Sequence, residues 1–462
     1  MTRLAISGFA AMLLSALTLP GPAFAQALPP EPRASAHARA IAAGYKALMT
    51  CSAVFNARAM GGVRTPASVD AWELAGIYPE YDALVSGMRA TIDRDRVTVG
   101  FDAKLPPRVA ISRGRAGCVI HPVGTDPALP ARTAAQTPAN IASATWPIGE
   151  PKGAVAPDAR LAPLFAKALS GGYGGRTTAV LVAQRGRLIG EAYAPDFGPD
   201  VPQRTWSVAK SIAGTLIGAA ALAKGFDADK PANLGRWRSA GDPRAAITVD
   251  HLLRMASGLH SDTAGNRTDA IYFGGTGVAE QAESWGLEAV PGTRFRYANN
   301  DILLAIRALR QSGRVTGTGF ADDLLFRPMG LSHLIAEQDW QGDYVLSSQI
   351  WATARDLARF GQLWLDDGRW AGKRLLPTGW MQRMTAPRGP QPTSGPGYGA
   401  TLWLFGPAQG LPAGSFAALG NRGQVVFVVP SQQLIIVRRG EDRGGGGFAT
   451  EAFAKDIAAA LP

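Results

Sequence analysis

The sequence predicts an α+β protein whose main domain is built around an antiparallel sheet. Two strand-turn-strand patterns carry this prediction. The first joins residues 177–183 to 188–193, and the second joins 424–429 to 434–439, each across a short polar turn. The stretch between these hairpins is largely helical in pattern. We therefore expect one sheet assembled from both ends of the domain, flanked by helices, together with a helical portion.

The chain begins with the pattern of a secretory signal in residues 1–25. Arg3 is followed by an apolar stretch over 4–19 and by Ala23-Phe24-Ala25, a small-residue cleavage site before Gln26. A membrane anchor is the alternative, but the apolar stretch is short, two prolines follow it, and no later segment is long enough to span a bilayer. We expect the mature chain to be exported, either to the periplasm or out of the cell.

Residues 26–145 form an N-terminal region, and residues 146–462 form the main domain. The N-terminal region has a helical pattern over 34–55, strand patterns over 97–101 and 109–112, and a Pro-, Thr- and Ala-rich stretch over 122–147 that is typical of a linker. No chemistry is recognisable in this region. Two roles are open: a cap that narrows a site, or packing alone.

The chain has two cysteines, Cys51 and Cys118, which are 67 residues apart (118 minus 51). In an exported protein such a pair favours one disulfide, with a nominal stabilisation of about 4 kcal/mol from closing a loop of this length. Two buried thiols are the alternative.

Composition narrows the function. Hydrophobic residues make up 46% of the 462-residue chain and charged residues 18%, the balance of a globular protein. The formal net charge of +11 is spread without a basic block, so nucleic-acid binding is not predicted. The histidines show no paired metal-ligand spacing, so we expect no metal site and no other cofactor; they are His37, His121, His251, His260 and His333.

The tetrad Ser207-Val208-Ala209-Lys210 opens an apolar, proline-free run that ends before Gly225. The run predicts a mostly buried helix over 207–224. Residues three apart share a helix face, so Ser207 and Lys210 are expected within proton-transfer reach. Burial favours the neutral amine of Lys210, which makes it a base, and the helix N-terminus favours an oxyanion at Ser207. The alternative is an N-cap serine beside a solvated lysine.

Tyr297 and Asn299 are two further candidates, because they follow a Pro-Gly turn signal and precede a helical pattern over 301–311. A tyrosine near a lysine has its phenolate favoured, so Tyr297 is a candidate proton relay. Asn299 is a candidate to bind Lys210 or the substrate. A half-buried tyrosine and a helix-capping asparagine are the alternative.

A third candidate segment, Gly420-Asn421-Arg422-Gly423-Gln424, leads into the second hairpin. Its two glycines permit close approach of a substrate, and an N–H at the strand start would complete an oxyanion hole. An ordinary turn before a strand is the alternative.

These three segments, in this order, resemble the motifs of serine hydrolases related to class C β-lactamases. The segment 247–259, which reads Ile-Thr-Val-Asp-His-Leu-Leu-Arg-Met-Ala-Ser-Gly-Leu, is similar to a stretch common in that group. The likeness covers about residues 146–462. It implies a β-lactamase/transpeptidase-like fold, with an antiparallel sheet flanked by helices, a helical domain, and the site between them.

The resemblance also implies roles for the candidate residues in a reaction without a metal. Ser207 would be acylated, Lys210 and Tyr297 would act as base and proton relay, and the N–H groups of Ser207 and Gln424 would form the oxyanion hole. Asn299, Asn421, Arg422 and Gly423 would border a small-molecule or short peptide-like substrate. For His260, which follows 257–259, two positions are open: the cleft, or a capping or core role.

The third motif departs from the β-lactamase pattern. Where β-lactamases have Lys-Thr-Gly, this chain has Asn421-Arg422-Gly423, so the cation that meets a β-lactam carboxylate is missing or is replaced by Arg422. The pattern is closer to carboxylesterases of type VIII and to aminohexanoate-oligomer hydrolases. We expect an exported serine hydrolase that cleaves an ester or amide. The alternatives are a DD-peptidase or weak β-lactamase, and a penicillin-binding-type receptor domain that is acylated without turnover.

Overall fold

The computed structural model describes residues 34–125, 145–261, 267–444 and 447–462. The predicted signal over 1–25 and most of the predicted linker lie outside these ranges. Ala36–Pro462 forms one compact unit. The predicted domain boundary near residue 145 borders a stretch that is not described, and it stays a prediction.

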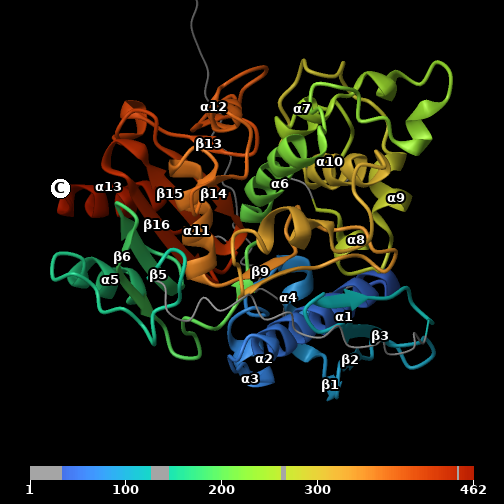
Figure 1. Cartoon of the computed structure of the whole chain (residues 1–462). Coiled ribbons are helices and arrows are strands. Elements are labelled where there is room, and N and C mark those ends of the chain that lie inside the picture. Colours follow the sequence, from blue (N-terminus) through green and yellow to red (C-terminus); the bar gives the residue numbers. More distant parts are fainter. Residues whose placement is uncertain (1–33, 126–144, 262–266, 445–446) are drawn as a thin grey trace, which may run out of the picture. The chain divides into compact units, whose positions relative to one another are not determined.

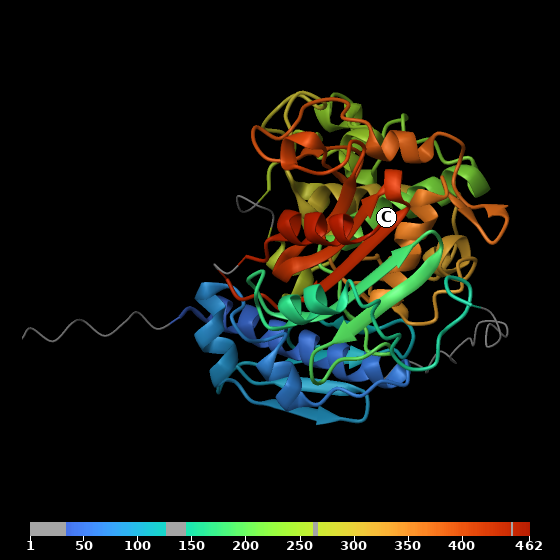
Figure 2. The ribbon, with the colours of Figure 1, turned by 90° about the vertical axis from the view of Figure 1, so that its left-hand side faces the viewer.

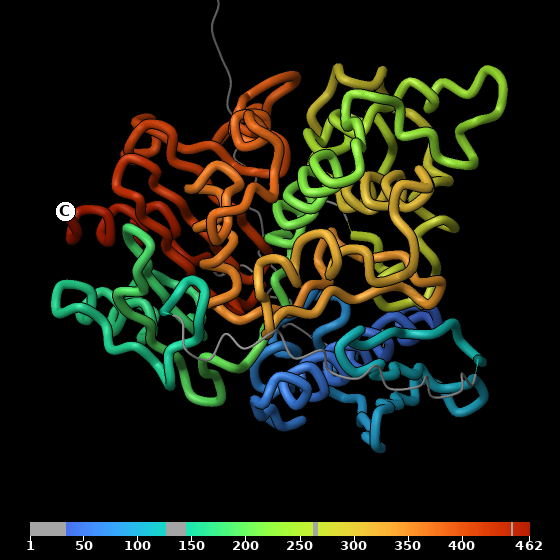
Figure 3. The backbone as a smooth tube through the Cα atoms, viewed as in Figure 1, coloured from blue at the N-terminus to red at the C-terminus, as the bar shows by residue number. Residues whose placement is uncertain are grey.

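A seven-stranded antiparallel sheet forms the centre of this unit, with the strand order β12-β13-β14-β15-β16-β5-β6. The strands are β5 (Thr177–Gln184), β6 (Arg187–Tyr193), β12 (Gly397–Tyr398), β13 (Trp403–Leu404), β14 (Phe416–Gly420), β15 (Gln424–Val429) and β16 (Leu434–Gly440). β16 pairs with β5, with Val437 opposite Leu181, so strands from both ends of the domain share one sheet as predicted. Figure 3 shows this pairing as the green segment beside the red end of the chain.

Both faces of the sheet are covered by helices. The covering helices are α5 (Ala162–Leu169), α11 (Ala354–Leu365) and α13 (Thr450–Ala460). Ile436 of β16 belongs to the core layer of α5 and α13, whereas its neighbour Val437 belongs to the layer of α11. Because successive strand side chains point to opposite faces, β15 and β16 are buried over their whole length and carry unbroken apolar runs. Figure 1 shows α11 and α13 against the sheet.

The helical portion lies between the two hairpins in the sequence. Its helices are α6 (Val208–Lys224), α7 (Val249–Leu253), α8 (Asp269–Tyr272), α9 (Val278–Gln281) and α10 (Asn299–Gln311), and α12 (Trp380–Thr385) follows α11. Small sheets are formed by β7 (Gln203–Arg204), β8 (Leu334–Ala336) and β9 (Ile350–Ala352), and by β10 (Arg369–Trp370) with β11 (Lys373–Arg374). The predicted helix after Ser207 is confirmed, and Gly225 ends it in the left-handed conformation with φ 62°.

The N-terminal region combines a helix group with a four-stranded sheet. Its elements are α1 (Ala36–Cys51), a π-helical turn (Ser52–Asn56), α2 (Ala57–Ala59), α3 (Pro66–Ala71), α4 (Pro79–Gly87), β1 (Ala90–Asp93), β2 (Arg96–Val99), β3 (Arg108–Ser112) and β4 (Cys118–Ile120). The predicted helix and both predicted strands are therefore confirmed. So is the disulfide, because Cys51 and Cys118 are bonded, with Cα atoms 6.1 Å apart.

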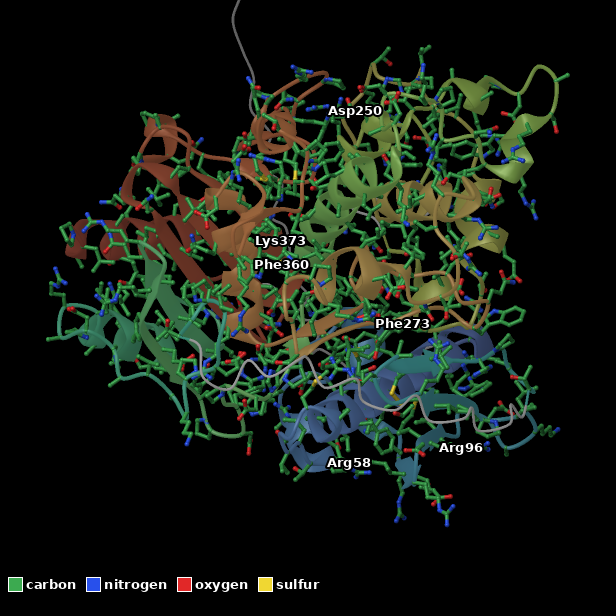
Figure 4. All side chains as sticks on the ribbon, in the orientation of Figure 1. Arg58, Arg96, Asp250, Phe273, Phe360 and Lys373 are labelled. Carbon is green, nitrogen blue, oxygen red and sulfur yellow. A yellow bond between two sulfur atoms is a disulfide. The ribbon has the colours of Figure 1, made fainter. Side chains whose placement is uncertain are left out.

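The N-terminal region packs onto the rest of the unit through buried polar and aromatic contacts. Glu337 accepts hydrogen bonds from Ser52 Oγ at 2.6 Å and from the N–H of Cys118 at 3.0 Å. The rings of Tyr45 in α1 and Phe273 are 4.4 Å apart. Figures 1 and 2 show the blue N-terminal segment along one side of the unit, and Figure 4 places Phe273 at this junction.

No helix in the described ranges has both the length and the apolar character that crossing a membrane requires.

Candidate active site

Ser207 lies at the N-terminal end of α6, directly after a residue in an unusual conformation. Trp206 has φ 49°, a left-handed value that costs a non-glycine residue about 1–2 kcal/mol. The Arg204 guanidinium lies 3.7 Å from the centre of the Trp206 ring, and Thr205 N–H donates to Ile350 O at 2.8 Å, which hold this turn. Within the described part of the chain, the Ser207 N–H has no hydrogen-bond acceptor. The turn therefore leaves both the hydroxyl and the N–H of Ser207 available at a helix N-terminus.

Lys210 is almost fully buried, with 1% of its surface exposed, and its amine meets three oxygen atoms. Nζ lies 2.8 Å from Ser207 Oγ, 2.6 Å from Asn299 Oδ1 and 2.9 Å from Ser347 O. Burial, followed by the nearby charge of Arg204, lowers the pKa of Lys210 well below its usual 10.5. In the neutral amine, two N–H groups donate to Asn299 and Ser347. The lone pair then remains for the proton of Ser207.

Tyr297 lies beside this pair, with its ring centre 5.0 Å from Lys210 Nζ. Burial raises the pKa of Tyr297 above its usual 10, and a hydrogen bond with Ser207 offsets only part of this effect. The expectation that Lys210 favours a Tyr297 phenolate is wrong for this resting site. The raised pKa keeps the proton on the Tyr297 phenol, and the lowered pKa of Lys210 favours its neutral amine, which offers no cation to stabilise a phenolate.

The turn that carries Tyr297 is supported by the segment 247–259. Arg296 N–H donates to Met255 O at 2.8 Å, and Ser257 Oγ donates to Asp301 Oδ1 at 2.7 Å. Asp301 lies in the first turn of α10 and is 1% exposed, and burial raises its pKa to about 7. A buried, titratable carboxyl therefore interacts electrostatically with Lys210.

The three predicted motifs meet at one cleft of about 440 Å³. Ser207, Tyr297, Asn299 and Asn421 all line it, so the structure brings together candidates from each of the three predicted motifs. Aromatic side chains from the N-terminal region, the helical portion and the sheet also line it, together with the charged residues Arg204, Arg267 and Asp269; the aromatic residues are Tyr78, Trp206, Tyr272, Phe273 and Trp403.

The end of β14 reaches the candidate nucleophile. Leu419 and Gly420 line the cleft, and a Cβ atom on Gly420 would fall 3.0 Å from Ser207 N and 2.6 Å from Thr205 O. Only glycine permits this approach. Gln424, in contrast, pairs with Gly420 across the hairpin and is fully buried, with its amide oxygen accepting from Arg439 Nε at 2.6 Å. The strand end beside Ser207 is thus formed by Leu419 and Gly420.

Arg422 turns into the N-terminal region. Its Nη1 donates to Gly76 O at 3.0 Å, its Nη2 donates to Trp72 O and Ala75 O at 2.8 and 2.9 Å, and its Nε donates to Glu441 at 2.5 Å. The side chain is 4% exposed. Its guanidinium is committed to these partners and does not take the place of the lysine that β-lactamases carry. Gly423, with φ 77°, closes the turn in a conformation that glycine favours.

His260 does not line the cleft. Its Nδ1 pairs with Glu288, its ring lies 4.9 Å from the ring of Trp285, and the side chain is 41% exposed. Of the two positions that the sequence left open, the structure places His260 outside the cleft, in a polar cluster with Glu288.

Sequence reasoning missed the Ser347 carbonyl, Leu419 and most of the aromatic residues that line the cleft. A backbone carbonyl leaves no mark in a sequence, so Ser347 was not accessible to pattern reading. Gly420 belongs to the third candidate segment, where its glycine was expected to permit close approach of a substrate; in the structure it brings the strand end itself against Ser207. In the described ranges, no group of three or more His, Cys, Asp or Glu side chains is placed to hold a metal ion.

Comparisons with known proteins agree with this geometry. The family model described as Beta-lactamase matches residues 164–459. A 6-aminohexanoate-dimer hydrolase of Paenarthrobacter ureafaciens is 25% identical over 310 residues, covering 57% of this chain and 72% of the relative. A solved putative 6-aminohexanoate-dimer hydrolase from Bacillus anthracis aligns with a TM-score of 0.54 at 22% identity, covering 64% of this chain and 81% of that one.

A penicillin-binding protein homologue from Caulobacter crescentus aligns with a TM-score of 0.54 at 17% identity, covering 67% of this chain and all of that one. The fold is therefore the β-lactamase/transpeptidase-like fold that the motifs predicted. Since the family model matches well over half of the sequence, the chain belongs to the beta-lactamase family of serine hydrolases.

Proposed function

We propose that this protein is an exported serine hydrolase that cleaves an ester or amide through an acyl-enzyme on Ser207. One observation carries the proposal: a buried amine with a lowered pKa lies 2.8 Å from a hydroxyl at a helix N-terminus. This pairing supplies a nucleophile together with its base. The hydrolase relatives named above support the reaction class.

The reaction begins when Lys210 Nζ takes the proton of Ser207 as Oγ attacks the substrate carbonyl carbon. The oxyanion is held by the N–H of Ser207 and by an N–H of the strand end at Leu419–Asn421. As the carbonyl re-forms, the bond to the leaving group breaks, and Tyr297 gives its proton to that group while Lys210 returns one to Tyr297. Water then attacks the acyl group in the same way, and Ser207 leaves with a proton.

An ester or linear amide fits this site better than a β-lactam does. The Asn421–Gly423 turn offers no cation to a β-lactam carboxylate, because Arg422 is buried against Trp72, Ala75 and Gly76. The aromatic side chains that line the cleft, such as Tyr272 and Trp403, favour an apolar substrate group. The alternatives are a DD-peptidase or weak β-lactamase, and a receptor domain that is acylated once.

The test is intact-protein mass spectrometry during turnover of nitrophenyl esters, a linear 6-aminohexanoate dimer and a chromogenic cephalosporin. We expect a covalent adduct and steady turnover for an ester or the dimer, and loss of both in Ser207→Ala. Ser211→Ala is the matched control, because Ser211 lies one turn further along α6 and donates to Thr401 O. Turnover that survives in Ser207→Ala refutes the assignment, and one equivalent of product without further turnover means a receptor.

The intact mass of the protein also tests export. The Cys51–Cys118 disulfide supports an oxidising compartment, and residues 1–25 carry the signal pattern. The mass of the mature protein should correspond to a chain that begins at Gln26. A full-length mass would contradict cleavage.

A further inference from the structure

A second cavity continues from the active-site cleft. It has a volume of about 370 Å³ and shares four lining residues with the cleft: Tyr78, Trp206, Gly420 and Asn421. Because Trp206 and Gly420 are immediate neighbours of Ser207, the second cavity begins beside the reacting hydroxyl. A small acyl group does not need this space, but a long one does.

Apolar and aromatic side chains line one part of the second cavity, beside polar residues such as Asn421, Asp442 and Thr450, and they come from both ends of the described chain. Ile77 and Tyr78 belong to the N-terminal region, and Phe448 lies before α13. Tyr78 is fixed between the Arg267 guanidinium, 3.9 Å from its ring centre, and the ring of Tyr45 at 6.2 Å. Residues 77–78 lie outside the span that the family model matches. The N-terminal region thus adds a wall that the matched span does not contain.

One cation on this wall is not neutralised. Arg443 lines the cavity and is exposed, and a Cβ atom on Gly76 would fall 2.6 Å from Arg443 Cβ, so the stem of the side chain lies across the N-terminal region. The acidic residues before it have other partners: Glu441 binds Arg422 at 2.5 Å, and Asp442 binds Arg438 at 2.7 Å. Within the described residues, Arg443 has no carboxylate partner.

The position of Tyr297 decides which end of a substrate enters this cavity. Tyr297 and Asn299 line the first cavity but not the second. The leaving group must stay beside Tyr297 to receive its proton, so it remains in the first cavity. The acyl chain extends past Gly420 and Asn421 in the other direction.

We propose that the second cavity is an acyl subsite for an apolar chain that ends in a carboxylate, with the chain against Tyr78 and Phe448 and the carboxylate on Arg443. The proposal rests on the acyl-enzyme function above. It assigns substrate selection to residues contributed by the N-terminal region and by the segment that follows β16.

The test compares kcat/KM for three 4-nitrophenyl esters: the monoester of suberic acid, the same compound with its far carboxyl capped as a methyl ester, and the acetate. We expect the parent enzyme to favour the free carboxylate over the capped ester by about five- to tenfold. In Arg443→Gln this ratio should fall to about one, while turnover of the acetate is unchanged. In Arg443→Glu the free carboxylate should become the poorer substrate.

Arg236→Gln is the matched control, because it removes one exposed arginine that lines neither cavity. Its carboxylate preference should equal that of the parent. If the parent turns over the acetate without preferring the carboxylate, or if Arg443→Gln keeps the preference, the subsite is refuted and the hydrolase function stands. If Ser207-dependent turnover of the acetate is absent, both proposals fall.

Discussion

At the scale of single residues, the chemistry depends on where two protons reside. Burial pushes the pKa of Lys210 down and that of Tyr297 up, so the amine accepts a proton and the phenol keeps one. Ion pairing contributes little to the pKa of Lys210, because the three atoms around its Nζ are a hydroxyl, an amide and a carbonyl oxygen. The nearby Asp301 is the acidic group that acts on Lys210, and its charge raises the pKa of the amine.

We predict that Asp301→Asn shifts the pH dependence of acylation to lower pH. Acylation needs neutral Lys210, so its rate falls as the pH drops below the pKa of Lys210. Removing a negative charge disfavours the ammonium form of Lys210 and lowers this pKa further. The acidic limb of the curve of acylation rate against pH therefore moves toward lower pH. The measurement is the burst rate of a nitrophenyl ester against pH.

The matched control for this shift is Asp323→Asn. Asp323 is an exposed carboxylate, 59% accessible, that pairs with Arg327. Its replacement should not change the pH at which the acylation rate falls. If the acylation rate of Asp301→Asn falls at the same pH as that of the parent, the Asp301 carboxyl does not act on Lys210.

At the scale of elements, α6 must lie very close to its neighbours to present Ser207 and Lys210. Trp380 Nε1 donates to Gly214 O at 3.2 Å, and a Cβ atom on Gly218 would fall 2.6 Å from Trp380 Cδ1. Both glycines are buried in the middle of the helix, where glycine is usually a poor choice. The close approach of Trp380 explains Gly218, and the close approach of Thr401 explains Gly214, because a Cβ atom there would overlap the Thr401 side chain.

We predict that Gly218→Ala lowers the free energy of unfolding by about 1–2 kcal/mol, because the added methyl group overpacks a full core and outweighs the better helix propensity of alanine. Urea unfolding measures this change. Gly87→Ala is the control, since Gly87 in α4 has no atom within 4 Å of an added Cβ, and it should be neutral or slightly stabilising. Equal unfolding midpoints for the two variants would contradict the packing explanation.

At the scale of the whole molecule, the N-terminal region is part of the site. Arg422 connects the turn beside Asn421 to carbonyl groups of Trp72, Ala75 and Gly76, and Tyr78 lines the cleft itself. Of the two roles that the sequence left open for this region, these contacts favour a wall that narrows the site. The disulfide then has a functional consequence, because it fixes α1 to β4 within that wall.

We predict that replacing both cysteines with alanine lowers the free energy of unfolding by about 4 kcal/mol, the chain-entropy value for a loop of this length. The bonded residues are 67 apart in the sequence. The parent protein in a reducing agent should unfold at the same lower denaturant concentration as the double variant. An unfolding midpoint that neither change moves would mean that the disulfide adds nothing to stability.

The sequence by itself determined the elements and the reacting pair. The spacing of apolar residues defined both hairpins and the helix after Ser207, and a spacing of three on a helix puts Ser207 and Lys210 together whatever the rest of the chain does. The order of the three motifs was enough to predict the family. Local rules decide all of these features, so local patterns reveal them.

Only the tertiary structure decided what surrounds that pair. Contacts between residues more than a hundred positions apart in the sequence bury Lys210, which lowers its pKa, and place the Ser347 carbonyl beside its amine. Contacts of the same kind place Gly420, and not Gln424, beside Ser207. Arg422 offered an available cation in the sequence, and the fold directed it to backbone carbonyls near Gly76. Desolvation and long-range hydrogen bonds depend on which surfaces meet, and no local pattern encodes that.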